Sequence, residues 1–159
     1  MGSRSNTDLA YIAGFLDGDG SLMLQIKKRK DGRVKTRFMA TICLYQDTRH
    51  EKILFWIQKV LGIGYISRRK DGMSELRING YVQVKAILEL LLPYIKCKAI
   101  QATALIKATK ILSKGMYRTL EKKQVLSLID CVLRVQNENY VTKKKKTREE
   151  LLGVLGLTP

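Results

Sequence analysis

Two segments of this chain share one pattern, in which an Asp-Gly dipeptide separates two stretches of alternating apolar and polar residues. Asp-Gly favours tight hairpin turns because both residues tolerate positive φ, and strict alternation indicates a strand with one buried face. The predicted strands are residues 21–30 and 36–44 around Asp31-Gly32, and residues 64–69 and 74–79 around Asp71-Gly72. We therefore expect two β-hairpins that together form a four-stranded antiparallel sheet.

Helical periodicity surrounds both hairpins. Thr7 and Asp8 can cap a first helix, which Gly18 and Gly20 would end. Further helices are predicted over residues 48–61, 81–92, 98–112, 120–136 and 147–155. The order αββαββα with extra C-terminal helices predicts an α+β fold, with helices on one face of the sheet and the other face open. We expect a single domain over residues 1–159, with 1–6 as a disordered leader.

The charge balance favours a polyanionic partner. Thirty Lys and Arg residues against fourteen Asp and Glu residues give a net charge of +16. A folded domain that carries this repulsion usually meets nucleic acid, although a solubilising role or an anionic membrane surface are alternatives. No apolar run approaches the roughly 18 residues that a membrane span needs, so we expect a soluble protein without membrane segments.

The few cysteine and histidine residues exclude several kinds of site. Cys43, Cys97 and Cys131 lie far apart, in neither a zinc-ligand pattern nor a disulfide framework. His50 is the only histidine, which argues against zinc-hydrolase and Ser-His-Asp chemistry. A reducing intracellular compartment fits this composition, and an organelle or a prokaryotic cytoplasm would serve equally well.

The most specific motif is Ile-Ala-Gly-Phe-Leu-Asp-Gly-Asp-Gly, residues 12–20. Taken alone, its last four residues could be an ordinary turn after a buried helix, and Met23 and Gln25 exclude an EF-hand calcium loop. The small residues Ala13 and Gly14 would let two such helices pack closely. The whole motif resembles the signature of the LAGLIDADG homing endonucleases, and the element order resembles that family over nearly the whole chain.

This resemblance implies a homodimer, because members with one motif pair their motif helices. Two Asp19 carboxylates would then share Mg²⁺, or another divalent cation such as Mn²⁺, with the Gly18 carbonyl, DNA phosphates and waters as further ligands. The expected interface residues are Ile12, Ala13, Gly14, Leu16 and Asp17. For Asp17 we favour a structural role, as a partner for backbone groups, over metal ligation.

The implied activity is sequence-specific hydrolysis of double-stranded DNA at a long, nearly palindromic site, which leaves 3′ overhangs and serves intron homing. Gln46 stands where the family carries a residue that positions water, and Lys98 stands where it places a lysine near the scissile phosphate. Arg49 and His50 are alternatives for a further basic position. An RNA-binding intron maturase and a non-cleaving DNA-binding regulator on the same fold are the rival functions. No small-molecule substrate is expected.

The open face of the sheet is the expected DNA-reading surface, since a twisted ribbon can enter the major groove. Its predicted readers are Gln25, Lys27, Arg29, Arg37, Met39, Thr41, Cys43, Ser67, Arg69, Glu75 and Arg77. The lysine run Lys143, Lys144, Lys145 and Lys146 would hold phosphates, because adjacent lysines supply charge without directional readout. A merely solvated sheet face and a solvated tail are the alternatives.

Overall fold

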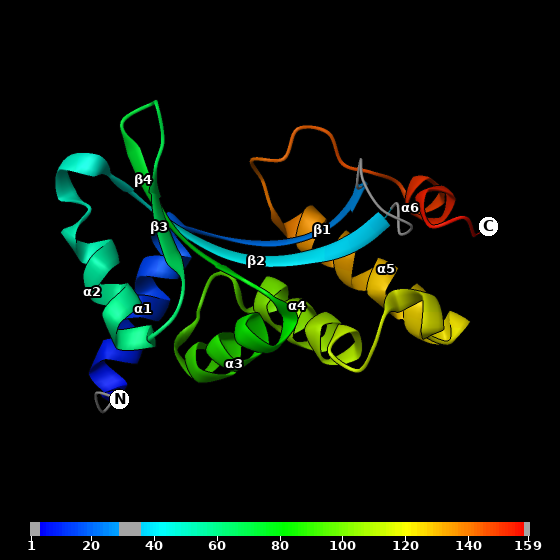
Figure 1. Cartoon of the computed structure of the whole chain (residues 1–159), viewed down its shortest axis with the longest axis horizontal. Coiled ribbons are helices and arrows are strands. Elements are labelled where there is room, and N and C mark those ends of the chain that lie inside the picture. The colour runs from blue at the N-terminus through cyan, green and yellow to red at the C-terminus, as the bar shows by residue number, and fades with distance from the viewer. Residues whose placement is uncertain (1–3, 29–35, 158–159) are drawn as a thin grey trace.

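The computed structural model describes residues 4–28 and 36–157. In chain order the helices and strands are α1 (Asn6–Asp19), β1 (Gly20–Lys28), β2 (Thr36–Asp47), α2 (Lys52–Leu61), β3 (Tyr65–Arg68), β4 (Met73–Asn79), α3 (Tyr81–Leu91), α4 (Ala99–Leu112), α5 (Lys122–Glu138) and α6 (Arg148–Val154) (Figure 1). Single 3-10 turns lie at Thr48–His50, Leu92–Tyr94 and Tyr117–Thr119. The expected α+β order is confirmed.

The four strands form one antiparallel sheet in the order β1-β2-β4-β3. The predicted alternation is confirmed along β1 and β2, where Leu22, Leu24 and Ile26 pair with Ile42, Ala40 and Phe38 on the buried face. Strand β2 runs three residues beyond its predicted end, because residues 45–47 continue the pairing with β4. The first Asp-Gly turn lies outside the described residues. The second Asp-Gly dipeptide ends a four-residue connection, with Gly72 at φ 80°.

The helices that the structure describes cover one face of the sheet. In Figure 1, α3, α4 and α5 lie beneath the long curved strands β1 and β2, while none of the described helices lies on the opposite face. The apolar side chains between these layers form a continuous core that includes residues of α1, both hairpins and the C-terminal helices. The Tyr81 hydroxyl donates to the Phe38 carbonyl (2.6 Å) and the Asn139 amide donates to the Leu22 carbonyl (3.1 Å), which fixes α3 and the end of α5 to the sheet.

The first helix begins earlier than the sequence predicted. The Ser5 hydroxyl, not Thr7 or Asp8, caps α1 by accepting from the Asp8 backbone N–H. The guanidinium of Arg4 donates to the carbonyls of Val60 and Leu61 at the end of α2. Residues 4–6 are therefore part of the fold, and the expectation of a disordered leader is wrong for them. Capping explains the difference, since helix N-termini leave N–H groups that a serine oxygen can satisfy.

The predicted helix over residues 48–61 is divided. A 3-10 turn comes first, and α2 then runs to Gly62, whose φ of 70° ends it in the left-handed conformation. No helix among the residues that the structure describes is both long and apolar enough to cross a membrane.

Candidate active site and nucleic-acid interface

Asp19 is the last residue of α1, and the residue after it fixes how the helix ends. Gly20 caps α1 by donating its N–H to the Leu16 carbonyl. A Cβ at Gly20 would lie 2.5 Å from the Leu16 side chain and 2.6 Å from its carbonyl oxygen, so only glycine fits. The Asp19 side chain is exposed, and no described residue donates a hydrogen bond to it. Its oxygens are thus open to an external partner.

Asp17, two residues earlier, has a different environment. Its carboxylate accepts from the backbone N–H groups of Lys96 (2.7 Å), Cys97 (3.0 Å) and Lys98 (3.0 Å), just before α4. Burial opposes ionisation, but these three hydrogen bonds lower the pKa of Asp17 below its usual value. The ammonium of Lys98 donates to the backbone carbonyl of Asp17. The backbone-binding role expected for Asp17 is confirmed, although its partners come from a segment 79 to 81 residues away.

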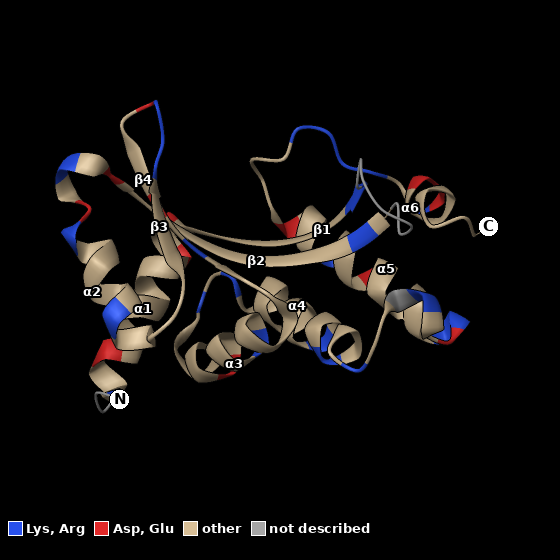
Figure 2. Ribbon diagram, in the orientation of Figure 1, with Lys and Arg blue, Asp and Glu red and all other residues tan. Residues whose placement is uncertain are grey.

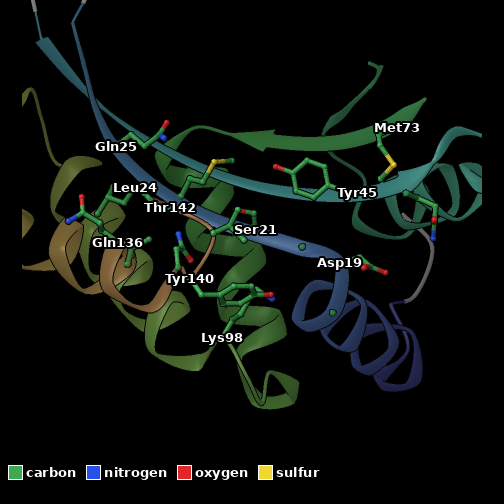
Figure 3. Close-up of a pocket in the computed structure, with 17 residues that line it drawn as sticks. Asp19, Ser21, Leu24, Gln25, Tyr45, Met73, Lys98, Gln136, Tyr140 and Thr142 are labelled. Carbon is green, nitrogen blue, oxygen red and sulfur yellow. The ribbon is translucent and has the colours of Figure 1, made fainter. Parts of the chain in front are cut away.

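An open pocket of about 570 Å³ lies at the edge strand β1 and brings the three predicted catalytic residues together (Figure 3). Asp19, Gln46 and Lys98 all line it, from the end of α1, the end of β2 and the start of α4. The other lining residues are Gly18, Gly20, Ser21, Met23, Leu24, Gln25, Tyr45, Met73, Val135, Gln136, Asn139, Tyr140, Val141 and Thr142. The pocket therefore joins the predicted catalytic residues to the open face of the sheet.

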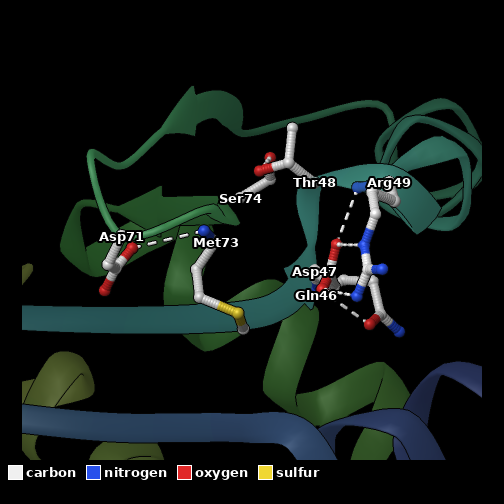
Figure 4. Close-up of polar contacts among 7 residues, drawn as sticks. All are labelled: Gln46, Asp47, Thr48, Arg49, Asp71, Met73 and Ser74. Atoms are coloured by element: carbon white, nitrogen blue, oxygen red, sulfur yellow. Dashed lines mark hydrogen bonds and ion pairs between the residues drawn. The ribbon is translucent and has the colours of Figure 1, made fainter.

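Gln46 is held by its neighbour and the two alternative basic residues lie elsewhere. The Gln46 side-chain oxygen accepts from the Asp47 N–H (2.8 Å), which leaves its amide nitrogen to donate (Figure 4).

Arg49 binds both oxygens of Asp47, at 3.0 and 2.7 Å, and this holds the pKa of that carboxyl far below its usual range. His50 is exposed, and neither Arg49 nor His50 lines the pocket.

The sequence interpretation missed several residues of this pocket. Tyr45 could have been found, since it continues the open-face parity of β2 directly before Gln46. Burial, aided by a contact with Cys43, raises the pKa of Tyr45 to about 12, so its hydroxyl stays protonated and can donate. The segment from Asn139 to Thr142 carries no recognisable motif, and only tertiary folding places it beside Asp19.

One chain offers an incomplete set of metal ligands. Within residues 4–28 and 36–157, no three Asp, Glu, His or Cys side chains cluster closely enough to hold an ion. The exposed Asp19 carboxylate and the neighbouring Gly18 carbonyl suit a hard cation such as Mg²⁺, which accepts waters and phosphates as its remaining ligands. The available donors thus fit a divalent ion that needs oxygens from outside the chain.

The open face of the sheet carries most of the predicted DNA-reading residues, but not all are accessible. Gln25, Lys27 and Arg37 are exposed, whereas Thr41 and Cys43 are only 1% and 0% exposed. Their expected exposure is wrong because β2 is an inner strand, so longer neighbouring side chains cover its small residues. Thr41 also donates to the Asn79 side chain (2.8 Å). Arg29 lies outside the described residues.

Glu75 lies at the centre of a polar network on this face. Its carboxylate accepts from Ser67 (3.2 Å) and Arg77 (2.9 Å) and contacts the Cys43 sulfur at 3.7 Å. Glu75 is 8% exposed, and the Arg77 side chain is 27% exposed. Because the Glu75 carboxylate is this covered, it orients Ser67 and Arg77 and is not itself accessible to a DNA base. Arg69 is paired with Asp71 (2.7 Å) in the turn between β3 and β4.

The motif helix buries three of the five predicted interface residues and exposes Gly14. Ile12, Ala13 and Leu16 are each 0% exposed within their own chain, so they cannot form an interface. Helical spacing places Thr7, Ala10, Gly14 and Gly18 together on the exposed side of α1. A Cβ added at Gly14 or Gly18 would meet nothing within 4 Å. The exposed surface of α1 includes this stripe and the neighbouring Tyr11, which is 53% exposed, whereas Asp17 is already engaged by its own chain.

The lysine run lies in the connection between α5 and α6, which Figure 2 shows as a largely blue loop. Gln136 fastens the end of this loop, since its amide exchanges two hydrogen bonds with the Lys146 backbone. The Lys145 ammonium donates to the Asn137 carbonyl (3.1 Å). Lys143 and Lys144 are exposed and make no hydrogen bond or ion pair with another described residue. The four lysines are therefore not equivalent.

Comparisons with known proteins agree with this geometry. DNA endonuclease I-CvuI of Chlorella vulgaris is 39% identical over 101 residues, 64% of this chain and 63% of that protein, so the aligned part is under two thirds of its length. DNA endonuclease I-CreI of Chlamydomonas reinhardtii is 26% identical over 156 residues, 98% of this chain and 93% of that protein. A crystal structure of I-CvuI with the I-CreI target and magnesium, in which the DNA is not cleaved, has a TM-score of 0.74 and 31% identity, and covers 96% of this chain and 97% of that one.

The model of the LAGLIDADG endonuclease family matches residues 12–112. This range begins at the motif and includes both hairpins, Gln46, Lys98 and the whole of α4. The structural neighbour has the same arrangement over nearly all of both chains. With motif, fold and family model in agreement, the chain belongs to the LAGLIDADG endonuclease family.

Proposed function

We propose that this chain is a homing endonuclease that cuts both strands of a long, nearly palindromic DNA site as a homodimer, with a divalent metal ion, and leaves 3′ overhangs. One observation carries the proposal. A single pocket gathers an open carboxylate, an amide donor and an ammonium group beside an open, basic sheet face. The named relatives are DNA endonucleases, which supports the same substrate for this chain.

Metal binding in this proposal depends on Asp19. The Asp19 carboxylate and the Gly18 carbonyl would hold the ion, and Mg²⁺ or Mn²⁺ bound there would supply an acidified water and neutralise phosphate charge. Since each chain offers one such carboxylate, two chains are needed to surround shared metal. A weak affinity for the ion without DNA follows, because most ligands would come from phosphates and water.

The remaining pocket residues would orient the reacting groups. Gln46 keeps its amide nitrogen available, because its oxygen is already bound to the Asp47 N–H. It would donate to a water or a phosphate oxygen. Lys98 would offset negative charge that develops on the phosphate during attack. The protonated Tyr45 hydroxyl is a further donor on the same pocket wall.

DNA would lie along the open sheet face. The accessible predicted readers that the structure describes are Gln25, Lys27, Arg37, Met39, Ser67, Arg69 and Arg77. Thr41, Cys43 and Glu75 would act indirectly, by shaping and orienting that surface. Lys143 and Lys144 would hold phosphates, with smaller contributions from Lys145 and Lys146, which are partly engaged.

The two chains would meet through the stripe formed by Thr7, Ala10, Gly14 and Gly18. Small side chains allow two helix backbones to approach closely, and the stripe ends beside Asp19. A two-fold axis along this contact would bring both Asp19 residues together and present the same reading face twice. We propose residues 1–159 as one functional domain that acts inside a cell, in an organelle or a prokaryotic cytoplasm.

The test is a selection for cut DNA. The protein is incubated with the I-CreI target and with a library of randomised palindromes, with Mg²⁺ or with a chelator, and the cut ends are sequenced. We expect Mg²⁺-dependent double-strand cuts with 3′ overhangs, slowed about 100-fold or more by Asp19→Asn. Glu149→Gln, which removes an exposed acid on α6 that does not line the pocket, is the charge-matched control and should cut normally. Equal cutting by Asp19→Asn and wild type, or no cutting by either, contradicts the proposal.

A further inference from the structure

Helices α1 and α4 are joined by a reciprocal contact at their facing ends. The side chain of Asp17 binds the backbone N–H groups of Lys96, Cys97 and Lys98, and the side chain of Lys98 binds the backbone carbonyl of Asp17. Each residue thus fixes the backbone of the other. The two residues are 81 positions apart, so this contact exists only in the folded chain.

The start of α4 has an acceptor supplied from outside the helix. Lys98 occupies the N-cap position of α4, and no side-chain hydrogen bond caps that helix from within. The N–H groups at a helix start have no acceptors inside the helix, and a negative charge is favoured there by the helix dipole. The Asp17 carboxylate accepts from the N–H of Lys98, the N-cap residue, and from the N–H groups of the two residues just before it. It therefore holds the segment that leads into α4 against the end of α1.

The same contact decides where the Lys98 ammonium lies. A lysine side chain has four rotatable bonds and, on an open surface, samples many positions. Here its backbone is held by Asp17, and its ammonium is held on the last turn of α1, two residues from Asp19. Asp19 and Lys98 accordingly line one pocket.

We propose that Asp17 is a positioning residue, which contributes to cleavage by fixing Lys98 against the end of α1 that carries Asp19. This inference rests on the proposed function, since it assigns Asp17 a part in the same reaction. Asp17 itself touches neither DNA nor metal in this account. Both oxygens of its carboxylate are bound by backbone donors, and a preorganised cation stabilises developing charge better than a mobile one.

A double-mutant cycle with Lys98 tests the assignment. Single-turnover cleavage rates at saturating protein are measured for wild type, Asp17→Asn, Lys98→Ala and the double variant, on DNA that the wild type cuts. Asparagine keeps the shape but offers one acceptor oxygen and places an NH₂ group against backbone donors. We expect Asp17→Asn to slow cutting at least about tenfold in the wild-type background, and less than about twofold when Lys98→Ala is present.

One further measurement, made with a matched control variant, separates positioning from a general loss of structure. DNA affinity without metal should change less than about threefold in Asp17→Asn, so that rate falls while binding is kept. Glu149→Gln, at an exposed acid on α6, is the matched control and should alter neither the cleavage rate nor the DNA affinity. If Asp17→Asn does not fold, the cycle is run with Asp17→Glu, which keeps the charge and shifts the carboxylate by one methylene.

The outcomes are distinguishable from those that test the proposed function. A wild-type protein that cuts no DNA removes the proposed function, and the positioning role falls with it. A wild type that cuts, together with an Asp17→Asn variant that cuts equally fast, overturns the positioning role alone. Equal slowing by Asp17→Asn with and without Lys98→Ala also overturns it, because Asp17 would then act independently of Lys98.

Discussion

Asp17 and Asp19 lie two residues apart in one motif, yet the fold gives them opposite surroundings. Asp17 receives three backbone N–H groups, whereas Asp19 receives none from the described residues. Helical geometry alone separates their directions, so the sequence could predict that they differ. It could not predict that residues 96–98 supply the donors, because that contact depends on how α4 packs against α1.

Glu75 provides a prediction at the same scale. Changing Glu75→Gln removes the anion that holds Arg77, so Arg77 should sample other positions and distinguish bases less well. We expect the selected cut sites to lose preference at one symmetric pair of positions, equivalent to about 1–3 kcal/mol of discrimination, with cleavage of the best site largely kept. Sequencing of selected sites is the readout. Unchanged preference at every position would show that Arg77 does not depend on Glu75.

At the scale of elements, both hairpins and most helices followed from sequence periodicity. The alternation in β1 and β2 identified the buried face correctly, because only one face of this sheet meets the core. Accessibility within the open face was harder to predict. Thr41 and Cys43 have the right parity but lie on an inner strand, where neighbours cover them. Parity gives the direction of a side chain, and its exposure depends on tertiary neighbours.

Two small residues of the motif helix, Gly14 and Ala13, should respond differently when their side chains are enlarged. Gly14 faces open space, while Ala13 is fully buried. Gly14→Leu should leave the monomer folded but block helix-to-helix contact, which would shift the mass in solution from dimer to monomer and abolish cutting. Ala13→Leu should instead destabilise each chain by about 1–3 kcal/mol through overpacking. Light scattering and thermal unfolding check both. A dimeric, active Gly14→Leu protein would place the interface elsewhere.

At the scale of the whole molecule, the net charge of +16 predicted a polyanionic partner. It did not predict which lysine and arginine side chains would contact that partner. The structure distinguishes the four lysines of the loop between α5 and α6, because internal hydrogen bonds engage Lys145 and the backbone of Lys146. The pocket around Asp19 was likewise predictable only in part. Its motif residues are recognisable, but the wall from Asn139 to Thr142 arises from packing at the end of α5.

Salt dependence tests the assignment of those lysines. Removing Lys143 and Lys144 together should weaken binding to all DNA sequences alike and reduce the slope of log affinity against log salt by about two. Titrations between low and moderate salt give the slope. The Lys122→Ala and Lys123→Ala double variant, which removes two exposed lysines at the start of α5, should leave the slope unchanged. Equal slopes for the Lys143/Lys144 variant and wild type would exclude phosphate contacts by that loop.

The central claim is that each chain supplies half of a shared, metal-dependent active site. Two copies can be joined by a flexible linker into one polypeptide, with Asp19→Asn in neither half, in one half or in both. We expect the unaltered tandem to cut both strands in Mg²⁺, and Asp19→Asn in one half to lower double-strand cutting about 100-fold or more. Double-strand cutting at the unaltered rate with Asp19→Asn in one half, or in both, would contradict it.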